Sequence, residues 1–332
     1  MIAGRFDHPL HRVGLALLAA LGYWIAISAI LSQRAPWAML SGLVFCALGY
    51  VAGRLTARYL ALWALPAAVV VAALAVVYTS PSGSFSHLSA QGFLGYANAK
   101  AAFFVQAAFA TVIVFARNRS WKVGLILLPP LVLFLAIPAA SRSLGAFLSS
   151  LVILPAVFVA VFRRGHRPMM IAAMALVAFT FLSSLSMSRA FSNGIEEGPE
   201  SRAAGVLDYG RARAWGDAYG MLSEYPVGGV GPGGFADASR SAIWESDLRW
   251  AHNEFLQLGA EIGAVGLFLV LSLFAWTFMR LSSPIAASST VAALAVAALA
   301  THASVDYLFH FPVIPALTLA LVGSTPLRAR RG

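Results

Sequence analysis

Long apolar runs alternate with short polar segments along most of the chain. A helix that crosses a bilayer needs about 20 predominantly apolar residues. Segments of about that length are residues 13–32, 36–53, 59–79, 100–116, 121–139, 143–162, 168–187, 262–281, 285–305 and 311–325. The last is short, so it can be a tilted or partial span. The pattern predicts an all-α, polytopic membrane protein of about ten transmembrane helices.

One long polar segment interrupts this pattern between the seventh and eighth predicted spans. Of the 13 acidic residues, 11 lie between Glu196 and Glu261. A connection of roughly 70 residues is far longer than an ordinary loop, and such loops are usually functional. We therefore divide the chain into seven helices (1–187), a large loop (188–261), and three helices with a basic tail (262–332).

Lysine and arginine residues indicate the orientation of the predicted helices. With the N-terminus in the cytoplasm, 14 of the 23 basic residues fall in cytoplasmic segments. Only Arg34, Lys100 and Arg142 fall in short outer loops, and the other six lie in the large loop, where the positive-inside rule does not apply. The alternation predicts cytoplasmic termini and a large loop on the outer face.

The composition excludes several classes of protein. Hydrophobic residues make up 60% of the chain and charged residues 11%, whereas a soluble domain has about 25% charged residues. The net charge of +10 comes from short clusters between apolar runs, so we expect no nucleic-acid partner. With Cys46 as the single cysteine and no metal-ligand spacing among the histidines and acids, we expect neither a disulfide nor a metal site.

Two residues at the predicted outer ends of spans can carry chemistry. His252 precedes the eighth span, and an imidazole can accept a proton near neutral pH. The alternative is an ordinary surface histidine near the lipid headgroups. Asp306 follows the ninth span, where an acid is costly unless it is paired. The alternative there is a structural pair with a loop arginine or His302.

Three arginines on the predicted outer side can bind an anion. Arg142 follows the fifth span, and Arg211 and Arg213 lie near the start of a helix predicted over 208–225. A guanidinium can bind a phosphate through two parallel hydrogen bonds. Arg211 shares a helix face with Trp215, and we expect that face to rest on the membrane. The alternative for all three is an interface anchor or headgroup contact.

Four segments, in order, resemble motifs of the O-antigen ligase family of bacterial membrane glycosyltransferases. The first resembles "SRGA" with Ser143 and Leu144 as extra residues, the second "gRxxxW…hPxxGvGpGxF", the third "aHNxyLqxxaElGxxGl" and the fourth "HSxxDfxxhiP". They are Ser141–Ala146, Gly210–Trp215 with Tyr225–Phe235, Ala251–Gly266, and His302–Asp306 with His310–Pro312. The resemblance extends over about residues 138–324, whereas the first 130 residues match only in hydropathy.

This resemblance implies a GT-C-like, inverting glycosyltransferase that needs no metal or cofactor. The enzyme would reside in the bacterial inner (cytoplasmic) membrane, with its large loop in the periplasm. Its donor would be a glycan linked to undecaprenyl diphosphate, and its acceptor a glycan or lipid A–core. Its other partners would be membrane lipids.

The resemblance also implies roles for individual residues. His252 matches the proposed catalytic histidine of the family, and Arg142 and Arg211 match arginines proposed to bind the diphosphate. We expect Arg213, Asn253 and Asp306, which lie close to these positions in the motifs, to contribute to the same substrate site.

Other functions remain open at this stage. An O-antigen or exopolysaccharide polymerase uses the same donor, and many polymerases carry an arginine followed eleven positions later by a glycine, a spacing that no arginine here has. A transferase that glycosylates proteins is a third candidate. A non-enzymatic lipid-glycan transporter would show internal repeats and polar residues at the membrane midplane, and this chain shows neither pattern.

The orientation can be tested with reporter fusions at Gly198 and Gly332. Because the positive-inside rule places the large loop outside, alkaline phosphatase should be active at Gly198 and inactive at Gly332. A cytoplasmic reporter such as green fluorescent protein should give the opposite result. Alkaline phosphatase activity at Gly332 would refute an even number of spans.

Overall fold

The computed structural model describes residues 8–57, 94, 96–118, 120–141, 143–162, 165–192, 209–244, 246–282 and 286–327, and within these ranges every regular element is a helix. The predicted all-α class is confirmed for this part of the chain. The α-helices are α1 (Pro9–Ser32), α2 (Trp37–Thr56), α4 (Ala97–Asn118), α5 (Trp121–Ala140), α6 (Leu144–Leu151), α7 (Ile153–Phe162), α8 (His166–Ser192), α9 (Tyr209–Glu224), α10 (Phe235–Ala238), α11 (Arg240–Trp244), α12 (Glu254–Leu281), α13 (Ala287–Ala303) and α14 (Val313–Ser324), and the short 3-10 helices are η4 (Ser246–Arg249) and η5 (Leu308–His310).

Seven helical stretches in the described residues are long and apolar enough to cross a membrane. They are α1, α2, α4, α5, α6 with α7, α8 and α12, each at a predicted span. The helices at the ninth and tenth predicted spans are shorter, with 17 residues in α13 and 12 in α14. The predicted span 59–79 lies outside the described residues. The chain is thus a multi-pass membrane protein, and the number of ten spans stays a prediction.

The described residues divide into two compact units. The first lies within Met1–Leu43, Ala178–Trp276 and Ala303–His310. The second lies within Val44–Val177, Thr277–His302 and Phe311–Gly332. Segments that are far apart in the sequence therefore meet within each unit.

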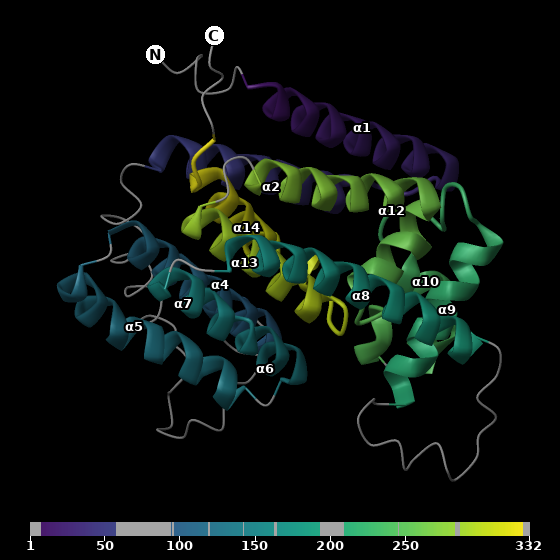
Figure 1. Cartoon of the computed structure of the whole chain (residues 1–332). Coiled ribbons are helices and arrows are strands. Elements are labelled where there is room, and N and C mark those ends of the chain that lie inside the picture. The colour runs from purple at the N-terminus through teal and green to yellow at the C-terminus, as the bar shows by residue number, and fades with distance from the viewer. Residues whose placement is uncertain are drawn as a thin grey trace. The chain divides into compact units, whose positions relative to one another are not determined.

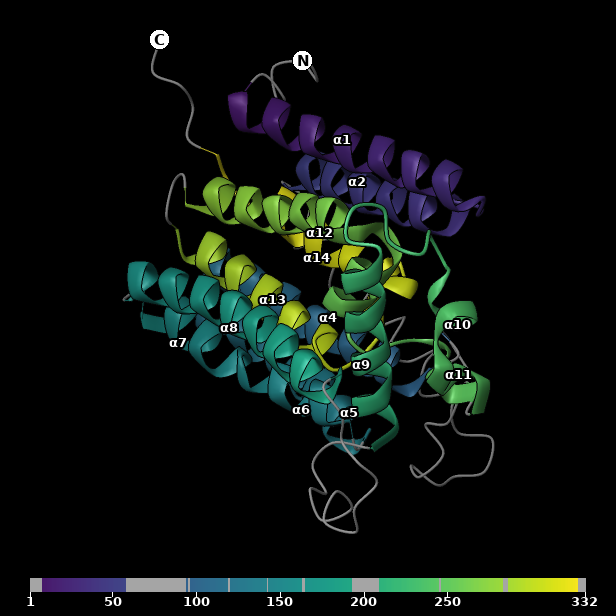
Figure 2. The same cartoon turned by 90° about the vertical axis from the view of Figure 1, so that its right-hand side faces the viewer.

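Helix α4 forms the centre of the second unit. It packs against α5, α6, α7 and α14, and Figures 1 and 2 show α4 to α7 grouped together. Most of its side chains are buried, and many of them are alanines. Helices α2 and α14 also approach closely, because a Cβ on Gly49 or Gly53 would lie 2.2 or 2.0 Å from a carbonyl oxygen of α14. This four-residue glycine spacing allows close backbone contact between membrane helices.

Basic side chains join several helix ends in the second unit. Arg280 is fully buried and donates to the Tyr50 hydroxyl and to the hydroxyl and carbonyl oxygens of Thr325, each at 2.8 Å. Arg117 donates to the carbonyl oxygens of Ala57, at 3.0 Å, and of Ser324. The ends of α2, α4, α12 and α14, all predicted to be cytoplasmic, therefore lie together.

Residues of α9, α10, η4 and α12 form a small buried core in the first unit. Helix α11 packs against α9 and η4, and Figure 2 shows it next to α10. Trp215 of α9 is 2% exposed and belongs to a buried cluster with Phe235 and Leu248. The expectation that this face of α9 rests on the membrane was therefore wrong. An apolar face can bury against protein as well as against lipid, and the periodicity of the sequence is the same in both cases.

Helix α12 is broken at Gly263, which the sequence pattern did not predict. This glycine has φ +67° and ψ −177°, a conformation that only glycine adopts readily. A break leaves helical backbone groups without their usual partners, and apolar surroundings supply no water to replace them. The groups around Gly263 must therefore find other partners in the protein.

The glycine-rich segment 227–235 provides two of these partners. Backbone amides of Val230 and Gly231 donate to the carbonyls of Ala260 and Glu261, at 2.8 and 2.9 Å. The indole of Trp24 in α1 donates to the carbonyl of Ile262 at 2.8 Å. These bonds attach the segment and α1 to the break in α12.

Replacement of Gly263 by alanine should destabilise the first unit. A Cβ there would lie 2.0 Å from the carbonyl oxygen of Val227, and the left-handed backbone adds strain, so we expect a loss of about 2 kcal/mol or more. The measurement is the thermal unfolding midpoint in detergent. Gly220→Ala in α9 is the matched control, because a Cβ there meets nothing within 4 Å. Equal midpoints for both variants would contradict this account.

Candidate functional site

His252 lies between η4 and the start of α12 in an unusual backbone conformation. Its φ is +49°, and the residue is only 2% exposed. Such a conformation costs a residue with a side chain about 1–3 kcal/mol and persists only where the surroundings hold it. The side-chain oxygen of Gln257 accepts the amide of the preceding residue, Ala251, at 2.7 Å.

Asn253 holds the backbone on the other side of His252. Its side-chain oxygen accepts the amides of Phe255 and Leu256, at 3.1 and 3.2 Å, and so caps α12. Its side-chain nitrogen donates to the carbonyl of Ser304 at 2.7 Å. These bonds explain why asparagine stands here, and they connect the start of α12 to the segment after α13.

The structure brings His252 and Asp306 together, although they were predicted as separate candidates. Nδ1 of His252 lies 3.7 Å from Oδ1 of Asp306, and both side chains are 2% exposed. Oδ1 of Asp306 also accepts the amide of Tyr307 at 2.9 Å. The ring of Tyr307 stands edge-on to the imidazole, with centroids 4.8 Å apart. A buried carboxylate beside an imidazole can hold the ring in one orientation.

One of the three predicted arginines contacts the same segment. Nη1 of Arg211, in α9, donates to the carbonyl of Val305, directly before Asp306, at 3.3 Å. Arg213 is two residues further along α9, so the two side chains leave the helix on different faces. Arg142 lies outside the described residues.

A second histidine–carboxylate pair, which the sequence pattern did not predict, lies beside this site. The Glu254 side chain is 2% exposed, and its Oε1 accepts the amide of Phe309 and lies 3.4 Å from Nδ1 of His310. Burial alone would lower the pKa of His310. The hydrogen bond to Glu254, the charges of Glu254 and Glu261, and the Tyr307 carbonyl outweigh burial and raise its pKa.

A chain of polar side chains connects His252 to the glycine-rich segment. Gln257 donates to Oε1 of Glu261 at 2.8 Å, and Oε2 of Glu261 accepts the amide of Gly233 at 2.8 Å. Glu254, Gln257 and Glu261 follow one face of α12 at the start of an apolar span. Polar residues in this position mark a functional or structural site, and this signal could have identified them.

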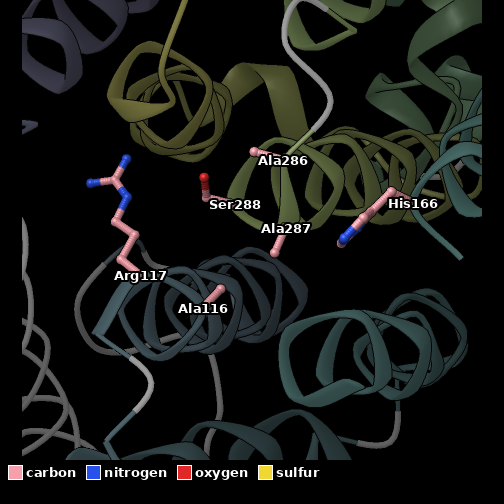
Figure 3. Close-up of a pocket in the computed structure, with 6 residues that line it drawn as sticks. All are labelled: Ala116, Arg117, His166, Ala286, Ala287 and Ser288. Carbon is pink, nitrogen blue, oxygen red and sulfur yellow. The ribbon is translucent and has the colours of Figure 1, made fainter. Parts of the chain in front are cut away.

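No group of three His, Cys, Asp or Glu side chains in the part of the chain that the structure describes is placed to hold a metal ion. A cavity of about 440 Å³ lies in the second unit and is lined by Ala116, Arg117, His166 and residues 286–288 (Figure 3). None of the candidate site residues that the structure describes lines it. The candidate site is instead formed by the segments around His252 and Asp306.

A comparison with protein families identifies the segment that carries most of these residues. Residues 129–271 match the family model described as O-antigen ligase. This chain carries an O-antigen ligase domain. The family resemblance inferred from the motifs is therefore confirmed. No curated protein matches the chain.

The O-antigen ligase domain includes Arg211, His252 and the break at Gly263. Asp306 and His310 lie beyond the matched residues and meet the domain through His252 and Glu254. The family comprises glycosyltransferase-like ligases and polymerases that act on lipid-linked glycans. The site therefore combines side chains of the matched domain with side chains of the segment 305–310.

Proposed function

We propose that the protein is a metal-independent, inverting glycosyltransferase that moves a glycan from undecaprenyl diphosphate to an acceptor hydroxyl. The acceptor is lipid A–core or a similar glycan, and the reaction takes place at the outer face of the bacterial inner membrane. One observation carries the proposal. His252 of the O-antigen ligase domain forms a buried pair with Asp306, and Arg211 of the same domain donates to the carbonyl of Val305, next to Asp306.

His252 is the proposed general base. The acceptor oxygen attacks the anomeric carbon as the bond from that carbon to the diphosphate oxygen breaks, which inverts the configuration. The acceptor proton moves to the imidazole and later returns to solvent, while the diphosphate leaves with the electron pair. Asp306, 3.7 Å from Nδ1, stabilises the imidazolium that forms. A positioned base of this kind typically contributes a factor of about 10² to 10⁴ in rate.

Arginines are proposed to stabilise the leaving diphosphate. Negative charge develops on this group in the transition state, and fixed guanidinium groups can stabilise it without a metal ion. Arg211 donates to the carbonyl of Val305, in the same segment as Asp306. Arg142 and Arg213 are proposed to take part in the same substrate site, and Asn253 to fix its backbone.

The large loop is proposed to be periplasmic. The end of α1, which the charge pattern places outside, contacts this loop: Ser28 donates to the carbonyl of Gly228 at 2.7 Å, and Arg34 pairs with Asp237 at 2.7 Å. These contacts support one common side for both segments. The proposed organisation is seven helices in residues 1–187, the large loop in 188–261, and three helices with a basic tail in 262–332. The helices are proposed to have a GT-C-like arrangement, and both termini are proposed to lie in the cytoplasm.

Deletion of the gene tests the acceptor. If the protein is a ligase, its loss should leave lipid A–core without attached glycan while long lipid-linked chains accumulate. Electrophoresis of the lipopolysaccharide and analysis of the lipid-linked pool measure both. Core that bears a single repeat would instead assign the protein as a polymerase. Unchanged surface glycans would reject both functions.

Substitution of His252 tests the chemistry. With purified protein, donor and acceptor, His252→Ala should lower the transfer rate by about two to four orders of magnitude, because the acceptor proton loses its base. His252→Gln can form a hydrogen bond but cannot take the proton, so it should be equally slow. His166→Gln, at a histidine of the other unit, is the matched control and should keep the wild-type rate. Near-normal transfer by the alanine variant would remove His252 from the mechanism.

A further inference from the structure

Four aromatic rings surround the candidate site, and two of them are histidines. Tyr307 stands edge-on to His252 and to His310, with centroid distances of 4.8 and 6.0 Å. Trp250 stacks on His310 at 5.0 Å with an interplanar angle of 25°. The His252 side chain is 2% exposed, whereas 33% of the His310 side chain is exposed. Of the two histidines, His310 therefore has the larger part of its side chain exposed to an incoming ligand.

Glu254 explains how His310 is oriented. A carboxylate that is 2% exposed is costly unless positive groups or hydrogen-bond donors surround it. The amide of Phe309 donates to Glu254, and Nδ1 of His310 lies 3.4 Å away. The Glu254 carboxylate thus fixes the orientation of the His310 ring and favours the protonated imidazole.

The surroundings of His310 favour its protonated form. Glu254 and Glu261 of α12 are the acids whose charges act on it, and the carbonyl of Tyr307 in its own segment adds to them. The indole of Trp250 stacks on it and favours a cation. Arg249 lies over the same indole, with its guanidinium carbon 6.0 Å from the ring centroid. Its like charge does not favour protonation of His310, but it supplies a second cation in this part of the site.

We propose that His310, oriented by Glu254, is a second histidine of the active site and binds the diphosphate of the donor as an imidazolium. The inference rests on the proposed function, since it assigns a further contact to the same donor. A metal-free site needs several fixed cations around a leaving diphosphate. His310 supplies one such cation, which is partly exposed and lies against the buried carboxylate of Glu254. The ring of Tyr307 stands edge-on to both His310 and His252.

The pH dependence of donor binding tests this role. His310 carries its charge below its raised pKa and loses it as the pH rises through that pKa. Both donor phosphates are esterified and keep one negative charge each between pH 6 and 9. Binding of the undecaprenyl-diphosphate-linked glycan to the full-length protein in nanodiscs, without acceptor, should therefore weaken about tenfold over this range, the loss expected for one charged contact.

Three variants separate charge from structure. His310→Gln should bind weakly and without the pH-dependent decrease, whereas His310→Lys should keep tight binding up to pH 9. Glu254→Gln should shift the decrease to lower pH, because the neighbouring carboxylate no longer raises the pKa of His310. Thermal unfolding midpoints would show that the His310 variants are folded.

Two outcomes would overturn the inference in distinguishable ways. If His310→Gln binds the donor with the affinity and pH dependence of the wild type, His310 does not contact the diphosphate, and the proposed function is unaffected. If the wild-type protein does not bind the donor at any pH, the proposed function fails and the role of His310 fails with it.

Discussion

The break of α12 at Gly263 is the constraint on which the first unit depends. When a helix ends among apolar residues, its unpaired carbonyl and amide groups need hydrogen-bond partners from other segments. Here those partners come from the glycine-rich segment and from Trp24, through bonds of 2.8–2.9 Å. The break therefore determines where the large loop and α1 attach to α12.

The same constraint explains the glycine-rich sequence 227–235 without a nucleotide or phosphate ligand. Its backbone must approach α12 so closely that a Cβ on Gly229 would lie 2.4 Å from the carbonyl carbon of Glu261. Gly231 and Gly233 also have positive φ angles. Because Glu261 accepts the amide of Gly233 and bonds to Gln257, the position of this segment is transmitted to the backbone beside His252.

Hydropathy predicted most spans because the signal is local: each needs only its own 20 or so apolar residues. His252 was also found locally, from its motif. The break at Gly263 was not, since its partners lie up to 238 positions away in the sequence. The prediction that Trp215 faces the membrane was wrong for another reason. An apolar helix face can pack against protein as well as against lipid, and the sequence pattern is the same in both cases. The pair of Glu254 and His310, 56 positions apart, needed the fold to bring it together.

Two histidine–carboxylate pairs then divide the proposed chemistry according to their exposure. His252 and Asp306 are buried, so a positive charge that forms on the imidazole lies next to a carboxylate in surroundings of low dielectric constant. His310 is partly exposed and lies against the buried Glu254, so its proposed positive charge is accessible to an incoming donor diphosphate. The bond from Asn253 to Ser304 ties the segments that carry both pairs at 2.7 Å. The fold thus sets the spacing between the proposed base and the proposed cation before any substrate binds. Such preorganisation is what the proposed metal-independent catalysis needs.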